Sequence, residues 1–250
     1  MIIHSILYKN DAMTSQNQKT LCDYALDILK TVDAHEKACK SREYAQKWRS
    51  DSNAQIGFIS EADMPLRPAR PDKPELLMPR DMPKRKKSGT DKNKIALLHA
   101  LSHIELNAID LAWDIIARFS GYYSADDFTL PTEFYTDWLK VADDEAKHFL
   151  MLSDRLSNFN ARYGDLPAHD GLWESAEKTA HDFAARLAIV PMVLEARGLD
   201  VTPHMIELMI SQGDQKTANL LQIIHDDEIT HVAAGTVWFK KWCHLSLIHI

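Results

Sequence analysis

The chain has 250 residues, of which 45% are hydrophobic and 26% are charged, and its formal net charge is −7. This composition fits a soluble protein with a sizeable core and excludes a disordered chain. The negative balance disfavours nucleic-acid binding by the protein as a whole, but not by a local basic patch. No apolar stretch approaches the length that a membrane span needs.

The first predicted element is one or two helices within residues 14–49. Thr14 or Ser15 is the candidate N-cap of the first helix. Apolar residues at helical spacing form its buried stripe. The stripe consists of Leu21, Ala25, Ile28, Leu29 and Val32.

Three cysteines, Cys22, Cys39 and Cys243, lie far apart and form no metal-type CxxC pair. An odd number of isolated cysteines is typical of a reducing, cytoplasmic compartment. The apolar opening MIIHSILYKN lacks the features of a signal peptide. We therefore expect a cytoplasmic protein.

Six prolines lie between Pro65 and Pro83. This density excludes a helix or a central strand, so the segment is predicted to be an extended connector on the domain surface. A basic run follows it. The run consists of Lys84, Arg85, Lys86 and Lys87. A solvated linker end is its ordinary interpretation, and a nucleic-acid contact is the alternative.

The rest of the chain is predicted to be helical. Long helices are expected at about 91–119, 132–160, 172–197 and 214–243, with a short helix near 203–212. Glycine and proline pairs mark the breaks, namely Gly121 with Pro131, Gly164 with Pro167, and Gly198 with Pro203. The prediction is an all-α protein. It has a helical appendage at 1–60, the proline-rich and basic connector at 61–90, and an antiparallel four-helix bundle at 91–250.

The bundle contains one hexapeptide pattern twice, DDEAKH at 143–148 and DDEITH at 226–231. Residues three apart share a helix face, so each copy can direct a carboxylate and an imidazole at one point. These pairs are Glu145 with His148 and Glu228 with His231. Two such helices, together with one glutamate from each of two others, make the dimetal site of ferritin-like bundles.

Helical phase supplies the two further glutamates. Glu105 lies in the apolar stripe of the first long helix, whereas His103 falls on roughly the opposite face. Glu195 is the candidate in the third helix, one turn after Pro191, which is expected to bend that helix. Glu177 is a rival, but it lies several turns from the level of the other ligands.

Buried ion pairs without a metal are the alternative interpretation of these residues. Six buried ionisable groups would be costly without a cation, so the metal interpretation is preferred. Carboxylates and imidazoles suit iron or manganese rather than structural zinc. Asp144 and Asp227 are expected to orient the histidines, either within a helix or across the helix pair, and ordinary surface aspartates are the alternative. His225 is an additional candidate ligand, a proton relay or a packed histidine.

Several longer segments resemble one family. They are HALSHIELNAIDLAWDIIARF (99–119), DWLKVADDEAKHFLMLSDRL (137–156), YGDLPAHDGLWESA (163–176), VLEARGLDVTP (193–203) and DDEITHVAAGTVWF (226–239). They are similar to the ferritin-like family called domain of unknown function 455. The resemblance implies a ferritin-like bundle and the ligand set Glu105, Glu145, His148, Glu195, Glu228 and His231. The final CHLSLIHI departs from the family pattern, which suggests a truncated or frame-altered end.

These observations favour a diiron protein that uses dioxygen to oxidise or hydroxylate an organic substrate. A non-catalytic iron-handling protein is the first alternative. An RNA-modifying hydroxylase is the second, by fold analogy with the diiron tRNA hydroxylase that acts on prenylated adenosine. The expected partners are dioxygen and a small-molecule or RNA substrate. A homodimer is compatible with the sequence, and no membrane partner is expected.

Overall fold

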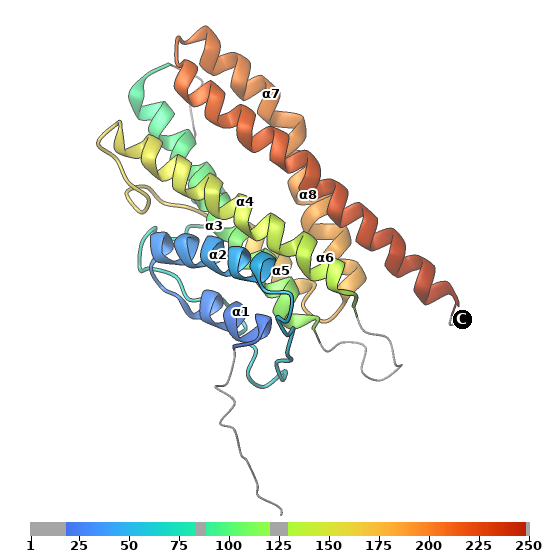
Figure 1. Ribbon diagram of the computed structural model, residues 1–250. Helices are drawn as coiled ribbons and strands as arrows, with labels where there is room; N and C mark the ends of the chain where they lie inside the picture. The colour runs from blue at the N-terminus through green and yellow to red at the C-terminus, as the bar shows by residue number, and fades with distance from the viewer. Residues whose placement is uncertain (1–18, 84–88, 121–129, 249–250) are drawn as a thin grey trace, which may run out of the picture.

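The computed structural model describes residues 19–83, 89–120 and 130–248 (Figure 1). These residues form helices, and their only β-type pairing is an isolated bridge between Leu76 and Ala168. The all-α prediction is therefore confirmed. The α-helices are α1 (Leu21–Lys30), α2 (Ala34–Ser50), α3 (Asp91–Arg118), α4 (Thr132–Ser157), α5 (Gly171–Lys178), α6 (Phe183–Ile189), α7 (Ala196–Ser211) and α8 (Gln215–Ile248). A 3₁₀ turn, η1 (Pro79–Asp81), lies in the connector, and a π-helical segment, η2 (Val190–Glu195), joins α6 to α7.

Side-chain caps set the start of both N-terminal helices. The Thr20 hydroxyl accepts a hydrogen bond from the Asp23 amide at 3.2 Å, and the Asp23 carboxylate accepts one from the Thr20 amide at 2.8 Å. This reciprocal pair satisfies amides that the first helical turn leaves free. Asp33 caps α2 with its own carboxylate. The caps predicted at Thr14 and Ser15 lie outside the described residues.

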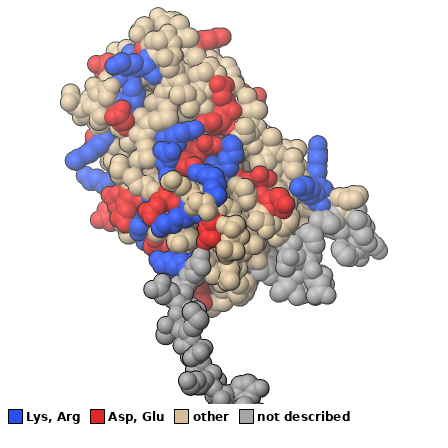
Figure 2. Space-filling model, viewed as in Figure 1, with Lys and Arg blue, Asp and Glu red and all other residues tan. Residues whose placement is uncertain are grey.

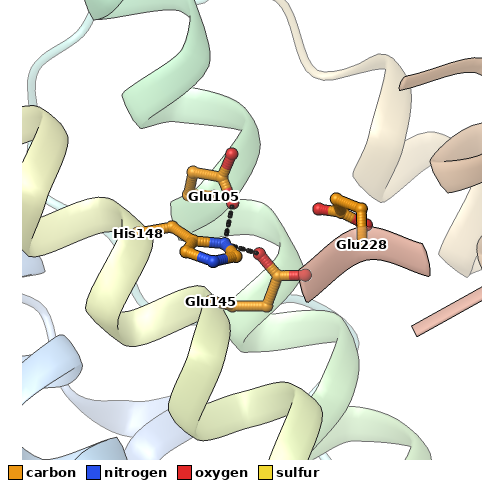
Figure 3. Close-up of side chains that lie close together, drawn as sticks. All are labelled: Glu105, Glu145, His148 and Glu228. Carbon is orange, nitrogen blue, oxygen red and sulfur yellow. Dashed lines mark ion pairs between the residues drawn. The ribbon is translucent and has the colours of Figure 1, made fainter. Parts of the chain in front are cut away.

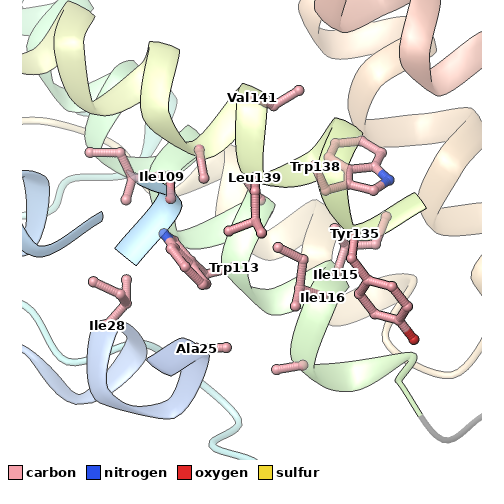
Figure 4. Packing of buried hydrophobic residues seen from close by; sticks show 14 of the residues in the cluster. Ala25, Ile28, Ile109, Trp113, Ile115, Ile116, Tyr135, Trp138, Leu139 and Val141 are labelled. Atoms are coloured by element: carbon pink, nitrogen blue, oxygen red, sulfur yellow. The ribbon is translucent and has the colours of Figure 1, made fainter. Parts of the chain in front are cut away.

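The N-terminal helices share their core with the bundle. Ala25 and Ile28 of α1 belong to the same buried cluster as Trp113 of α3 and Leu139 of α4 (Figure 4). The predicted apolar stripe of α1 is buried except for Val32, which lies beyond the end of the helix and is 54% exposed. Residues 21–50 therefore pack as part of the main body.

The face of α3 opposite Glu105 is also buried, and it is polar. Lys37 of α2 donates a hydrogen bond to Asp110 at 2.6 Å, and both side chains are almost fully buried. Arg70 of the connector donates to the second Asp110 oxygen at 2.9 Å. Asp114 is neutralised in the same way by Arg118 and Arg186. Because each buried carboxylate has cationic partners, α2 and the connector can cover this face.

Helix α3 is paired with α4 and α7 with α8 (Figure 1). Leu98 and Leu156 share one buried cluster, and Ile116 and Phe134 share another. The start of α3 therefore lies beside the end of α4, so the pair is antiparallel. The turn between α7 and α8 is tied to α4 by Asp214, which accepts a hydrogen bond from Arg155 at 2.8 Å.

The prediction of one helix over 172–197 was wrong. The chain leaves helical structure between α5 and α6, and Asp182 caps α6 by accepting a hydrogen bond from the Ala185 amide at 2.9 Å. Pro191 then removes the amide that a regular α-helix needs. The helix passes this proline as the π-helical segment η2 rather than as a simple bend.

The break predicted at Gly198 and Pro203, with a separate helix at 203–212, was also wrong. Helix α7 runs through both residues as far as Ser211. It packs along α8, and that burial outweighs the poor helix propensity of glycine and proline. The Thr202 hydroxyl adds a hydrogen bond to the Gly198 carbonyl at 2.8 Å. Tertiary packing has overridden a local signal here.

Helix α3 and the charged surface are relevant to the expectations about membranes and nucleic acids. By length and composition α3 could span a membrane, but 67% of its most apolar window is buried inside the protein, as is common for a core helix. Acidic and basic side chains are interspersed on the face in Figure 2. The basic run at 84–87 lies outside the described residues, so the expected nucleic-acid contact stays a prediction.

Candidate metal centre

Four predicted ligands converge between the helices. Glu145 and His148 of α4 face Glu105 of α3 and Glu228 of α8 (Figure 3). One ligand atom from each lies within 4.8 Å of all the others. The His148 Nδ1 atom is 3.4 Å from Glu105 and 3.6 Å from Glu145. Three helices therefore bring four donors to one point.

A second group adjoins the first and shares a residue with it. Glu195 of η2 and His231 of α8 meet Glu228 within the same 4.8 Å limit. The His231 Nδ1 atom is also 3.1 Å from the Glu145 carboxylate. Glu145 and Glu228 thus reach both groups, while Glu105 and Glu195 belong to one each. The two groups together contain four glutamates and two histidines, which are the donor types of the dimetal sites in helical bundles.

The donor atoms are buried and make no hydrogen bonds. They are Glu105 Oε2, Glu145 Oε1 and Oε2, His148 Nδ1, Glu195 Oε2, Glu228 Oε2 and His231 Nδ1. Such atoms carry the full cost of desolvation unless something else compensates them. They point toward common positions, and the two histidine Nδ1 atoms lie between 3.1 and 3.6 Å from the glutamate oxygens. Cations at those positions would satisfy them, so the residues present fit a pair of hard or borderline metal ions.

The two histidines are held by aspartates from the opposite helix. His148 Nε2 of α4 donates to Asp227 of α8 at 2.9 Å. His231 Nε2 of α8 lies 3.4 Å from Asp144 of α4. With the proton assigned to Nε2, the Nδ1 lone pair of each ring faces the centre. Asp144 and Asp227 therefore lie where the sequence places residues that orient the ligands, and each contacts the histidine across the helix pair.

A lysine that the sequence analysis did not single out links these aspartates. The Lys147 ammonium donates to Asp227 at 2.6 Å and to Asp144 at 3.1 Å. Lys140 adds a hydrogen bond to Asp144 at 2.9 Å and one to Thr230 at 2.9 Å. Lys147 occupies the fifth position of the first hexapeptide, three residues after Asp144, and that spacing was the available signal. The α4–α8 side of the centre is thus covered by a charged network.

Burial and crowded charge shift the pKa values of the ligands. Burial and the nearby Glu145 carboxylate raise the pKa of Glu105 well above its usual range. Burial and repulsion from neighbouring glutamates also raise the pKa values of Glu195 and Glu228. Burial alone would lower the pKa of His148, but Glu105 and Glu145 outweigh it and raise that pKa. Without a metal ion, the raised pKa values mean that the glutamates and His148 bind protons, which offset the negative charge of the crowded carboxylates.

Local backbone structure places Glu195. It is the last residue of η2, four residues after Pro191, so the π-helical turn sets its direction. Gly235 of α8 lies against this turn, because a Cβ atom there would meet the Pro191 ring at 2.5 Å. Glycine is therefore the residue that lets α8 approach the π-helical segment closely.

The sequence is similar to one protein family and to one curated protein. The profile of a family described as "Protein of unknown function (DUF455)" matches residues 30–248. The chain belongs to the DUF455 family. It is 45% identical over 171 residues to an uncharacterized protein of Haemophilus influenzae. The match covers 68% of this chain and 59% of that relative, so the chain spans well under two thirds of the relative's length. No solved structure is significantly similar.

The remaining candidates in this DUF455 chain lie away from the ligand groups. His225 is half-buried and contacts Asp226 at 3.5 Å. Glu177 pairs with Arg67 at the surface. His103 is buried on another face of α3, and its pKa is lowered to about 3, chiefly by burial. The structure brings none of these three residues into either ligand group.

The outer aspartate of the first hexapeptide has a structural contact. Asp143 accepts hydrogen bonds from Arg42 at 3.0 Å and from Arg49 at 2.6 Å, both from α2. These exposed pairs tie α2 to the helix that carries Glu145 and His148, although each contributes little by itself.

Proposed function

We propose that this DUF455 chain is a carboxylate-bridged diiron protein that uses dioxygen to oxidise or hydroxylate an organic substrate. The proposal extends to the fold, in which α3, α4, η2–α7 and α8 correspond to the helices of a ferritin-like bundle. The observation that carries it is the pair of adjoining donor groups that share Glu228, with buried atoms free of hydrogen bonds. Manganese suits the same donors and is the competing metal.

The roles of the side chains follow from this proposal. Glu145 and Glu228 would bridge two ions, while Glu105 with His148 and Glu195 with His231 would complete one ion each. Bound iron supplies dioxygen activation. The protein limits the access of water by burying Glu105, Glu145, His148 and His231. Asp144 and Asp227 hold the histidine rings. No side chain is assigned as a general base.

Metal content and an optical spectrum test the proposal. The protein is loaded with ferrous iron without air, freed of excess metal and then exposed to air. We expect about two irons per chain and an absorption typical of an oxo-bridged pair. Under the same conditions we expect His231→Gln to lose iron and His225→Gln, on the same helix, to retain it. Full iron content in His231→Gln would contradict the ligand assignment.

Dioxygen consumption separates an oxidase from an iron-handling protein. An oxidase or hydroxylase keeps consuming dioxygen when a suitable substrate and, for hydroxylation, an electron donor are supplied. Uptake that stops once the bound iron is oxidised would instead favour iron handling.

A further inference from the structure

Helix α8 has two sides with different surroundings. One side carries the ligands Glu228 and His231, and the helix packs against α4, α6, η2 and α7. The other side is exposed, and the C-terminal half of the helix runs along one edge of the protein (Figure 1). At about 100° per residue, the positions from 222 to 240 that lie within about 40° of Ala233 form one straight face. This outer α8 face consists of Gln222, Asp226, Ile229, Ala233, Val237 and Lys240, all of them exposed.

The middle of the outer α8 face is apolar. Ile229 and Val237 lie four residues before and four residues after Ala233, and they are 52% and 45% exposed. The small side chain of Ala233 between them allows a second helix to approach closely, because the distance between packed helices depends on the side chains at the contact. Single exposed apolar residues are common, so these positions do not by themselves identify a partner.

The charges that flank the apolar part do identify one. Asp226 lies seven residues before Ala233, and Lys240 lies seven residues after it, so each is about 10 Å from Ala233 along the helix. The Asp226 side chain is 63% exposed, and Lys240 is exposed as well. A second α8 that runs in the opposite direction and crosses at Ala233 would therefore place Asp226 of each copy beside Lys240 of the other.

The same arrangement matches the apolar residues. Ile229 of each copy would lie at the level of Val237 of the other, on both sides of the crossing. A parallel pair would instead place Asp226 beside Asp226 and Lys240 beside Lys240, and like charges in contact oppose association. The outer α8 face is thus complementary to a second copy of itself in the antiparallel direction, as a twofold axis requires.

We propose that this chain forms a homodimer through the outer α8 face, with two antiparallel α8 helices that cross at Ala233 on a twofold axis. Two ion pairs between Asp226 and Lys240 and two apolar contacts between Ile229 and Val237 surround the axis. The inference goes beyond the proposed function and does not depend on it, because Glu228 and His231 lie on the other side of α8.

Charge reversal tests the predicted ion pairs. The full-length protein is examined by sedimentation over a range of concentrations, and we expect a dimer for the wild type. Asp226→Lys places like charges beside each other on both sides of the axis, so it should raise the dimer dissociation constant at least about tenfold. Asp226→Lys combined with Lys240→Asp exchanges the two charges and should return the constant to within about threefold of the wild-type value. Asp72→Lys makes the same charge change in the connector and should leave it unaltered.

Cysteine crosslinking tests the position and direction of the pair. In a protein with Cys39→Ser and Cys243→Ser, the substitution Ala233→Cys brings two thiols together at the crossing, and oxidised glutathione should join the chains by a disulfide. Gln222→Cys in the same protein is the control. Its two copies would lie about 33 Å apart in the antiparallel pair, but beside each other in a parallel one.

Several outcomes would overturn the inference. A wild-type protein that remains monomeric at about 100 μM has no such dimer. Dimers that tolerate Asp226→Lys, or that are not restored by the charge exchange, use another surface, and crosslinking of Gln222→Cys but not of Ala233→Cys indicates parallel helices. The thermal unfolding midpoint of each variant shows whether a lost dimer reflects a lost fold. A wild-type dimer that binds no iron would contradict the proposed function alone.

Discussion

The two halves of the candidate centre are built differently. The α4–α8 half comes from a repeated hexapeptide on two regular helices, and its histidines are fixed by aspartates and Lys147. The α3–η2 half has no sequence repeat, and one of its carboxylates is placed by a π-helical turn. Each of its two glutamates has a buried oxygen without a hydrogen-bond partner. Hydrogen bonds between helices position the histidines of the repeated half, whereas the backbone of η2 positions a carboxylate of the irregular half.

Removing a shared carboxylate should have the largest effect. Glu145 contacts both histidines, so Glu145→Gln is expected to lower the affinity for both metal ions by about a hundredfold or more, because each loses a charged ligand. Metal analysis after dialysis against a weak chelator measures this loss. Glu177→Gln, which changes a surface carboxylate, is the control. A Glu145→Gln protein that retains two ions would remove the distinction between bridging and terminal residues.

The ligand residues that could be predicted from the sequence are those where metal-binding residue types recur at helical spacing. Glu145, His148, Glu228 and His231 were found from one spacing repeated on two helices, and Glu105 from its place in an apolar stripe. The structure brings all of them together. These residues lie on uninterrupted α-helices, where a fixed angle per residue predicts direction well.

The predictions were wrong where tertiary packing, rather than the local sequence, determines the backbone conformation. Glu195 reaches the centre, but from a π-helical turn and not from the bent α-helix expected for it. Gly198 and Pro203 lie inside α7, although both residues normally end helices. Lys147 was missed because its second partner, Asp227, is 80 positions away along the chain. Contacts of that kind carry no local signal.

Neutralising the aspartates that contact the histidines should lower metal affinity by less than the Glu145 substitution does. Asp227→Asn is expected to lower metal affinity by about tenfold to a hundredfold, because His148 loses the acceptor that fixes its ring. Lys147→Met should act in the same direction through both aspartates. Lys140→Met contacts only Asp144 and is the matched control with a smaller expected effect. Equal losses from the two lysine variants would contradict the linking role of Lys147.

A substitution at the π-helical turn should affect the irregular half selectively. Gly235→Ala places a methyl group 2.5 Å from the rigid Pro191 ring, so the turn that carries Glu195 must move. We expect a stability loss of about 1–3 kcal/mol in chemical unfolding. The iron ion that Glu195 holds should be lost first, which would leave about one iron per chain. Gly235→Ala with full stability and two irons would show that the close contact is not needed.

The smallest expected effect is the change of metal affinity with pH, which involves ligands from both halves. The raised pKa values of Glu105, Glu195, Glu228, His148 and His231 mean that the metal-free centre holds protons. A metal ion must displace them, so affinity should rise with pH and fall as the solution is acidified. Calorimetry in buffers with different ionisation enthalpies counts the released protons. Metal affinity that is constant from about pH 6 to about pH 8 would contradict the stated pKa directions.

The crossed hydrogen bonds between α4 and α8 bear on the order of assembly. Each helix carries the aspartate that prepares the other helix's histidine, so neither helix alone presents both imidazoles in the required tautomer. A nascent chain has completed α4 long before α8 has been synthesised. The contacts that orient both histidines therefore exist only after α8 has packed against α4, and we expect metal to bind after this packing rather than before it.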